Sequence, residues 1–271
     1  MAILVGLFGT VIGSFLNVVV HRVPLGRSVV APASACPGCG SRIRPYDNIP
    51  VVSWLVLRGR CRDCAAPISV RYPAVELATG VFFALVVLRF LPELLSAASA
   101  TALLGVVLTL AAFLYLAAVS VALALIDLEV RRLPDAIVLP AYLVGAALLA
   151  AGALLQGDPA ALLRGAVGAG ASFAFYLALA LIKPGGMGLG DVKLAGVLGL
   201  FLGVLGWEHL VLGVFSAFLL GGLVGAVLLA TRRASRSASI PFGPWMLLGA
   251  WIAVFAAPTL WSAYLTATGL A

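Results

Sequence analysis

Long apolar runs separated by short polar loops dominate this chain of 271 residues. Most runs are close to the ~20 residues that an α-helix needs to cross the hydrocarbon core of a bilayer. The boundary between the sixth and seventh runs is the weakest, because only Gly206-Trp207-Glu208-His209 interrupts the apolar sequence. The pattern predicts eight transmembrane helices, at residues 1–20, 74–91, 101–126, 134–156, 161–182, 190–206, 208–230 and 241–265.

The first apolar run has no basic residues before it and no cleavage site of small residues after it. We therefore expect a membrane helix over residues 1–20 rather than a removed signal peptide. Gly9 and Gly13 form a G-x-x-x-G pair in this helix. The pair favours close packing against another helix, although glycine is also common in membrane helices for no such reason.

The composition excludes a water-soluble globular protein. The chain is 63% hydrophobic and 10% charged, with a mean hydropathy of +1.17. Soluble domains average about 25% charged residues. We therefore expect an all-α polytopic membrane protein surrounded by the lipid bilayer.

The net charge of +7 could suggest a nucleic-acid partner, but the basic residues lie in short loops between apolar runs. With residue 1 placed outside, only Arg89 and Arg164 of the seventeen cations stay outside. By the positive-inside rule, the N-terminus is outside, and residues 21–73, Asp127 and Asp191 are cytoplasmic. We expect no nucleic-acid partner. The inside loops hold eight arginines from Arg22 to Arg71, with Arg131, Arg132, Lys183, Lys193, Arg232, Arg233 and Arg236.

Residues 21–73 differ from the rest of the chain because they contain all four cysteines and little continuous apolar sequence. The cysteines form two C-x-x-C pairs, a spacing that can close a tetrahedral zinc site. Two disulfides or four free thiols are the alternatives, but the cytoplasm keeps thiols reduced. Four thiolates would leave no open position on the metal, so we expect structural zinc, which would also help so small a domain to fold. The predicted ligands are Cys36, Cys39, Cys61 and Cys64.

Two aspartates lie at the edges of apolar runs, where a carboxylate is costly and needs a reason. Asp127 ends the run that begins near residue 101, and Asp191 begins a later one. Two carboxylates held close together share one proton near neutral pH. The ionised one can then activate a water, and the protonated one can donate to a peptide carbonyl. The pair therefore suggests a membrane aspartyl protease.

Both stretches also allow simpler interpretations. Asp191 could cap the N-terminus of a helix, and Asp135 could stabilise the start of the helix that follows Pro134. The loop before Asp191 is rich in glycine, which would let a substrate backbone approach the acid. Its glycines are Gly185, Gly186, Gly188 and Gly190.

The stretch Gly188-Leu189-Gly190-Asp191-Val192-Lys193 resembles the GxGD signature of the type IV prepilin peptidases. G-x-G-D alone is weakly specific, but further stretches occur in the family's order and cover nearly the whole chain. They are Gly13-Ser14-Phe15-Leu16-Asn17-Val18-Val19, the two cysteine pairs, Asp47-Asn48-Ile49-Pro50 with Ser53-Trp54-Leu55, Arg58-Gly59-Arg60-Cys61, Arg71-Tyr72-Pro73-Ala74-Val75-Glu76-Leu77, Asp127 to Asp135, and Ile240-Pro241-Phe242-Gly243-Pro244.

The resemblance implies that Asp127 and Asp191 are the catalytic aspartates, supported by Gly188, Gly190 and Lys193. It implies a protease of the inner (plasma) membrane that cuts prepilins and pseudopilins on the cytoplasmic face, after a glycine that ends a short basic leader. Members that have the cysteine domain also N-methylate the new N-terminal residue with S-adenosylmethionine. Weak candidates for binding this donor are Asn48, Arg71 and Glu76, and Glu76 could equally be an acid favoured at a helix start.

We therefore expect a first transmembrane helix at 1–20, a cytoplasmic zinc domain at 21–73 associated with methyl transfer, and a seven-helix peptidase domain at 74–271. Three alternatives stay open: a peptidase whose zinc loop is only structural, a relative that cuts other membrane substrates, and a transporter. Acids and glycine-broken helices also mark ion paths, but a zinc loop is not explained by transport.

Overall fold

The computed structural model describes residues 1–183, 186–231 and 241–270. Gly185 and the loop arginines Arg232, Arg233 and Arg236 lie outside these ranges, as does Ile240. The chain divides into two compact units. Unit 1 comprises Met1–Ser96 and Phe113–Ala122, and unit 2 comprises Ala97–Ala112 and Leu123–Ala271.

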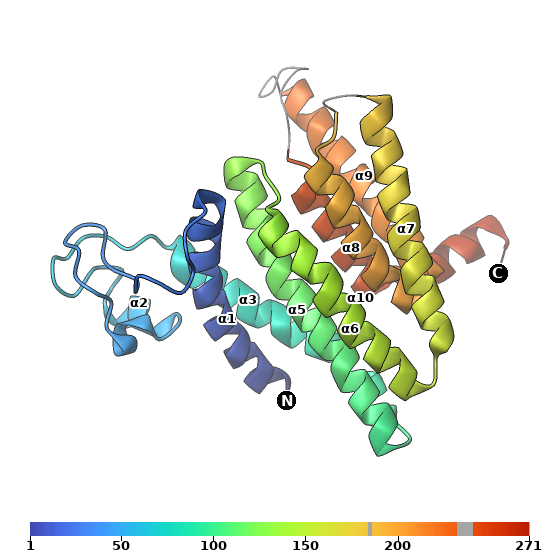
Figure 1. Cartoon of the computed structure of the whole chain (residues 1–271), viewed down its shortest axis with the longest axis horizontal. Helices are drawn as coiled ribbons and strands as arrows, with labels where there is room; N and C mark the ends of the chain where they lie inside the picture. The colour runs from blue at the N-terminus through green and yellow to red at the C-terminus, as the bar shows by residue number, and fades with distance from the viewer. Residues whose placement is uncertain (184–185, 232–240, 271) are drawn as a thin grey trace. The chain divides into compact units, whose positions relative to one another are not determined.

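Helices make up nearly all the regular structure of the described residues, and the extended backbone among them is confined to two isolated bridges, at Ala35–Arg42 and Arg60–Pro67. The all-α prediction is therefore confirmed (Figure 1). The long helices are α1 (Ala2–Arg22), α3 (Arg71–Arg89), α5 (Ala100–Val130), α6 (Asp135–Gln156), α7 (Pro159–Ile182), α8 (Leu189–Leu205), α9 (Trp207–Ala230) and α10 (Gly243–Thr268). Shorter helices are η1 (Val23–Leu25), η2 (Pro45–Asn48), α2 (Val52–Val56) and α4 (Leu91–Ser96).

Each of the eight predicted segments corresponds to one long helix, and seven of the described helices are long and apolar enough to cross a membrane. The exception is α8, which has only 17 residues. At 1.5 Å per residue it is about 26 Å long, slightly less than the ~30 Å of bilayer hydrocarbon. The chain is a multi-pass membrane protein.

In unit 1, α1 packs along α3 through small residues. A Cβ atom added to Gly9 would lie 2.8 Å from Cβ of Phe83, and one added to Gly13 would lie 2.7 Å from Cα of Glu76. The glycine pair of the first helix therefore serves close helix packing, as one of the two interpretations predicted. The residues between α1 and α3 form the cysteine segment, which contains η1, η2 and α2.

In unit 2, α8 lies among α6, α7, α9 and α10 (Figure 1). Ten of its 17 residues are buried, including Val192, Leu194 and Phe201. Its closest neighbour is α7, because the backbones touch where Gly168 faces Gly199. The short, shielded helix α8 thus forms the centre of the unit that carries both candidate aspartates.

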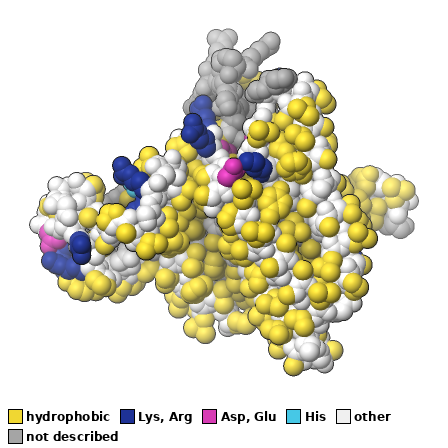
Figure 2. Space-filling model, in the orientation of Figure 1, with side chains coloured by type: hydrophobic (Ala, Val, Ile, Leu, Met, Phe, Trp, Pro, Cys, Tyr) yellow, Lys and Arg dark blue, Asp and Glu magenta, His cyan; other side chains and the backbone are white. Residues whose placement is uncertain are grey.

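Hydrophobic side chains cover the flanks of the helices on the face seen in Figure 2, while charged side chains gather in small groups at helix ends and on the cysteine segment. This distribution is the one expected for helices that cross lipid and keep their charges at the interfaces.

Candidate active site and metal centre

Asp127 lies in the last turn of α5, in a buried position with only 4% of its surface exposed. Its Oδ2 accepts a hydrogen bond of 3.1 Å from the backbone N–H of Gly243, the first residue of α10. The helix ends at Arg131, which takes a left-handed conformation with φ of 53° and donates its N–H to the carbonyl of Asp127. Thus Asp127 belongs to the helix itself, although the apolar run was predicted to end at residue 126.

Asp191 lies in the first turn of α8 and is partly exposed. Its Oδ2 accepts a 3.1 Å hydrogen bond from the backbone N–H of Gly188, the residue that caps the helix. The capping interpretation is therefore correct for the local geometry. It does not exhaust the role of Asp191, because one carboxylate oxygen in the cap leaves the other available for chemistry.

Asp191 and Asp127 lie within electrostatic range of each other in unit 2, although 64 residues separate them in the chain. Tyr176 of α7 also interacts with Asp191. Leu133, in the loop between α5 and α6, lies between the glycine loop and the start of α10. A Cβ on Gly190 would lie 3.0 Å from Cβ of Leu133, and one on Gly243 would lie 3.2 Å from its Cδ2. The site is thus built from three helix ends and one loop of unit 2.

Asp135 is engaged elsewhere. Both of its carboxylate oxygens lie 2.8 Å from Nζ of Lys193, in α8. The hydroxyl of Tyr142 donates to the backbone carbonyl of Lys193 at 2.6 Å. These two contacts join the beginning of α6 to the first turns of α8. They give the lysine of the GxGD stretch a role in fixing the helix that carries Asp191.

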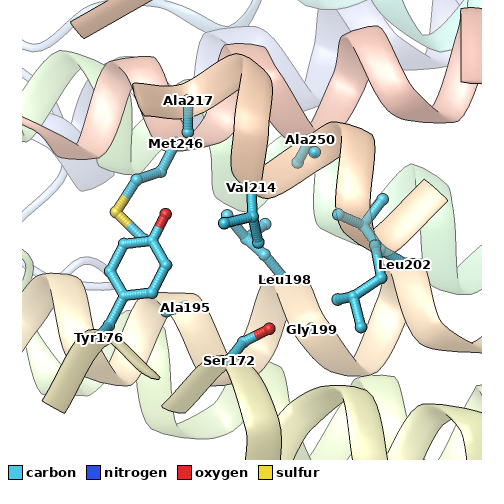
Figure 3. A pocket seen from close by; sticks show the side chains of 12 residues that line it. Ser172, Tyr176, Ala195, Leu198, Gly199, Leu202, Val214, Ala217, Met246 and Ala250 are labelled. Carbon is cyan, nitrogen blue, oxygen red and sulfur yellow. The ribbon is translucent and has the colours of Figure 1, made fainter. Parts of the chain in front are cut away.

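A small cavity continues the face of α8 on which Asp191 lies. Ala195, Leu198, Gly199 and Leu202 line it at helical spacing from Asp191, together with residues of α7, α9 and α10. It has room for about one water molecule. Ser172 and Tyr176 bring hydroxyl groups to an otherwise apolar lining, which also includes Met246 (Figure 3).

The cysteine segment forms a second candidate site, in unit 1. The four sulfur atoms of Cys36, Cys39, Cys61 and Cys64 all lie within 4.8 Å of one another. Sγ of Cys36 and Sγ of Cys64 are 3.7 Å apart. Zinc–sulfur bonds of about 2.3 Å in a tetrahedron place sulfurs roughly 3.8 Å apart, so the cluster fits a tetrahedral metal. The sequence prediction that these four residues form one cluster is confirmed.

The two cysteine pairs have the same backbone form. In each, the residue four positions after the first cysteine donates its N–H to the carbonyl of that cysteine, Gly40 to Cys36 at 2.8 Å and Ala65 to Cys61 at 2.9 Å. Both residues have positive φ, 73° and 57°. The sulfurs therefore point to a common centre because two equal turns face each other.

Hydrogen bonds and neighbouring thiols give the thiols of Cys39 and Cys64 different pKa values. Hydrogen bonds from Ser41 lower the pKa of the Cys39 thiol to about 7. A hydrogen bond from Ala66 favours the thiolate of Cys64, but contacts with the other three sulfurs outweigh it and raise its pKa to about 12. Four sulfurs so close together cannot all ionise unless a cation compensates them, which is the chemistry of a metal-thiolate site.

Ion pairs tie the second cysteine pair to the segment before it. Arg62 donates to both oxygens of Asp47, at 2.6–3.1 Å, and this contact lowers the pKa of the Asp47 carboxyl. Arg44 donates to Asp63 at 3.0 Å. Arg62 and Asp63 both lie between the two cysteines of the second C-x-x-C pair, so their ion pairs set the orientation of that turn.

The three candidate residues for binding a methyl donor differ in burial. Asn48 and Arg71 are exposed, whereas Glu76 is buried in α3. Oε2 of Glu76 accepts a 2.7 Å hydrogen bond from the backbone N–H of Val51. Val51 has a φ of 61°, so Glu76 holds the cysteine segment in a strained turn. A structural contact thus exists for Glu76, and a role in donor binding stays a prediction for all three.

Two family descriptions match this chain. Residues 7–90 match the bacterial peptidase A24 N-terminal domain, and residues 114–226 match the type IV leader peptidase family. A prepilin leader peptidase/N-methyltransferase of Pseudomonas aeruginosa is 36% identical over 97% of this chain and 91% of its own length. The chain belongs to the type IV leader peptidase family.

Further relatives of the chain carry the same description. The protein of Aeromonas hydrophila is 38% identical over 97% of this chain and 93% of its own length. The protein of Myxococcus xanthus is 41% identical over 86% of this chain and 65% of its own length. No solved structure matches the chain significantly.

Sequence reasoning missed three residues of the candidate site. Gly243 lay in a quoted stretch but had no role assigned, and Leu133 and Tyr142 were not singled out. Their contacts join segments that are 51 to 116 residues apart. A local motif search carries no signal for such contacts, although the short interval between Asp127 and Asp135 marks the loop that contains Leu133.

Proposed function

We propose that this chain is a bifunctional prepilin peptidase that cleaves the leader of prepilins or pseudopilins with Asp127 and Asp191 and then N-methylates the new N-terminus. Its family is an aspartic peptidase family, and its relatives are described as prepilin leader peptidase/N-methyltransferase. The observation that carries the proposal is the placement of Asp127 and Asp191, two carboxylates at the ends of different helices of an apolar protein, within electrostatic range of each other. Leu133 packs against Gly190, beside Asp191, and against Gly243, whose N–H binds Asp127.

The proposed chemistry needs one proton shared by the two aspartates. The ionised carboxylate removes a proton from water, whose oxygen attacks the peptide carbonyl. The protonated carboxyl donates to the carbonyl oxygen, and a proton then passes to the leaving amine as the C–N bond breaks. Gly190 lets Leu133 pack against the start of α8, Gly188 caps this helix beside Asp191, and Lys193 holds the helix through Asp135.

We propose zinc as the metal of the four-cysteine cluster, with a structural role, because four cysteine ligands leave no open coordination position. S-adenosylmethionine would supply the electrophilic methyl group. We propose the cysteine segment 21–73 as the part associated with methyl transfer, and Asn48, Arg71 and Glu76 remain its candidate donor residues. The chain's own contribution to this step would be to present the free amine of the cleaved substrate.

The distribution of cations supports the proposed orientation in the inner membrane. With the N-terminus outside, the cysteine segment and the ends of α5 and α8 that carry the aspartates lie on the cytoplasmic side. The basic leader of the proposed substrate would be met on the same side. The bilayer is the partner implied by the seven apolar helices.

Single substitutions in the purified membrane enzyme test the proposal. Asp127→Asn and Asp191→Asn each remove one carboxylate and should lower the rate of prepilin cleavage by at least about 1,000-fold, because neither general-acid nor general-base step has its partner. Asp135→Asn is the matched control: it weakens only the ion pair with Lys193 and should lower cleavage by no more than about fivefold. Mass spectrometry of the pilin product, with and without S-adenosylmethionine, gives both readouts.

Cleavage that survives loss of either aspartate would refute the mechanism and favour a transporter. Cleavage without a gain of one methyl group would leave a peptidase with a structural metal segment. Activity on membrane substrates but on no prepilin would place the chain with relatives of other specificity.

A further inference from the structure

The stretch Pro241-Phe242-Gly243-Pro244 has no role in the mechanism as described so far, yet it lies against the acid pair. It begins α10, and Gly243 is the first residue of the helix. Gly243 is buried and donates its backbone N–H to Oδ2 of Asp127 at 3.1 Å. The donor and acceptor are 116 residues apart in the chain, so the contact depends on the tertiary structure of unit 2.

We propose that Gly243 is a positioning residue of the acid pair: its N–H fixes one oxygen of Asp127, and its lack of a side chain leaves the space that this carboxylate occupies. Such an arrangement would leave Oδ1 of Asp127 for the reacting water. This inference rests on the proposed function, because it matters only if Asp127 takes part in cleavage.

The first argument is steric. A Cβ atom on residue 243 would lie 2.7 Å from Oδ2 and 3.4 Å from Cγ of Asp127. Contacts below about 3 Å are repulsive for carbon and oxygen that are not hydrogen-bonded, so the carboxylate would have to move. The same Cβ would lie 3.2 Å from Cδ2 of Leu133, so this side chain would have to shift as well. Only glycine fits at this position without displacing the acid.

The second argument is that the donor itself is held firmly. The ring of Phe242 lies 5.3 Å from that of Phe218 in α9 and 6.3 Å from that of Tyr176 in α7, measured between centroids. A Cβ on Gly221 would lie 2.7 Å from Cε2 of Phe242, which shows how closely the ring fits against α9. Pro244 restricts the backbone at the first turn of α10. The packing of Phe242 and the restricted backbone at Pro244 therefore hold the N–H of Gly243 in place.

The third argument is chemical. A backbone N–H at the beginning of a helix is a strong donor to an anion, because the first N–H groups have no partner within the helix and the helix dipole favours negative charge there. Asp191 receives the same kind of donor from Gly188. Each aspartate is thus held by one backbone N–H at a helix start and keeps one oxygen for the reaction.

Glycine-to-alanine variants of the full-length membrane enzyme test this role with steady-state cleavage of one prepilin. Gly243→Ala should lower kcat about 100-fold and leave KM within about twofold, because displacement of a reacting group by about 1 Å can cost this much without affecting substrate binding. Gly222→Ala in α9 is the neutral control, because a Cβ there meets nothing within 4 Å. It should leave both constants unchanged.

Gly249→Ala separates positioning from packing. This residue lies in the same helix, and the atoms nearest to its Cβ would belong to Ala217 and Gly213 of α9, with the Ala217 nitrogen at 2.6 Å, and not to either aspartate. It should lower the Tm at least as much as Gly243→Ala does, while kcat per folded enzyme stays within about threefold. Equal losses of kcat in the two variants would show that packing alone explains the effect and would overturn the proposal.

A second substitution covers the case in which Gly243→Ala does not fold. Phe242→Leu removes the ring that anchors the helix start but adds no atom beside Asp127, and it should lower kcat about tenfold. Phe255→Leu, which removes a ring near Trp251 in the same helix, is its control and should leave kcat within twofold. An unchanged kcat in Gly243→Ala or in Phe242→Leu overturns the proposal. If Asp127→Asn also cleaves normally, the proposed function itself fails.

Discussion

The cysteine segment and the aspartate site are built in opposite ways. All four sulfurs come from residues 36 to 64, each sits in a turn of five residues, and none of the four cysteines is buried. The aspartate site draws on residues from 127 to 243, and Asp127 is buried. A metal site can thus be assembled from short local turns, whereas the acid pair exists only when several helices of unit 2 have packed.

This difference decides what stabilises each site. The cysteine segment has little apolar sequence and contains two ion pairs, so its stability would depend largely on the proposed metal. The acid pair depends on close helix packing, since Gly168 and Gly199 bring α7 against α8 and Gly243 brings α10 against Asp127. Loss of the metal should therefore affect one site far more than the other.

Removal of cysteine ligands should produce the largest change in activity. It tests most directly whether the cysteine segment and the aspartate site are independent. The double variant Cys61→Ser/Cys64→Ser should lose its zinc completely, because two ligands cannot replace four, and methyl transfer should fall more than about 100-fold. Cleavage should fall less than tenfold, because every described contact of Asp127 and Asp191 lies within unit 2. Metal analysis and product masses measure all three.

Asp63→Asn is the control for this variant. Asp63 lies between the two cysteines but pairs with Arg44, so the metal should remain. Loss of cleavage in parallel with zinc would show that the two sites are not independent and would remove the contrast.

A smaller effect should follow from breaking the ion pair that joins α6 to α8. Lys193→Met should lower kcat about fivefold, because the first turn of α8 loses a contact that fixes Asp191. The free energy of unfolding should change by less than about 1 kcal/mol, as is usual for partly exposed pairs. The exchanged pair Asp135→Lys/Lys193→Asp should recover at least half of the lost activity. Lys183→Met, at the end of α7, is the control, and a loss that the exchange does not rescue would contradict a positioning role.

The smallest predicted effect concerns one turn of the cysteine segment. Gly40 has a φ of 73° and open space around it, so Gly40→Ala adds only the conformational cost of about 1 kcal/mol for a left-handed residue. If metal binding and folding are coupled, zinc affinity measured by competition with a chelator should fall about fivefold. Gly26→Ala has the same conformational cost, since Gly26 has a φ of 65° in open space outside the cysteine turns. Its zinc affinity should be unchanged, and an equal loss there would argue against a local cause.

How well the sequence predicted each region depended on how far apart in the chain the contacting residues are. The spacing of the cysteines was enough to predict their cluster, because each C-x-x-C turn is set by its own residues. Run length placed most helices within a few residues, as 134–156 against Asp135–Gln156 illustrates. The end of α5 was misplaced because Asp127 and Glu129 are polar yet continue the helix up to the left-handed Arg131. The bonds from Gly243 to Asp127 and from Lys193 to Asp135 required the packed helices.

The shortness of α8 bears on hydrophobic mismatch. A helix in contact with lipid must tilt or deform the bilayer when its length differs from the hydrocarbon thickness. Since α8 packs against α6, α7, α9 and α10 and buries ten of its 17 residues, those longer helices face the lipid for it. The height of Asp191 along the bilayer normal is therefore set by neighbouring protein and not by the thickness of the membrane.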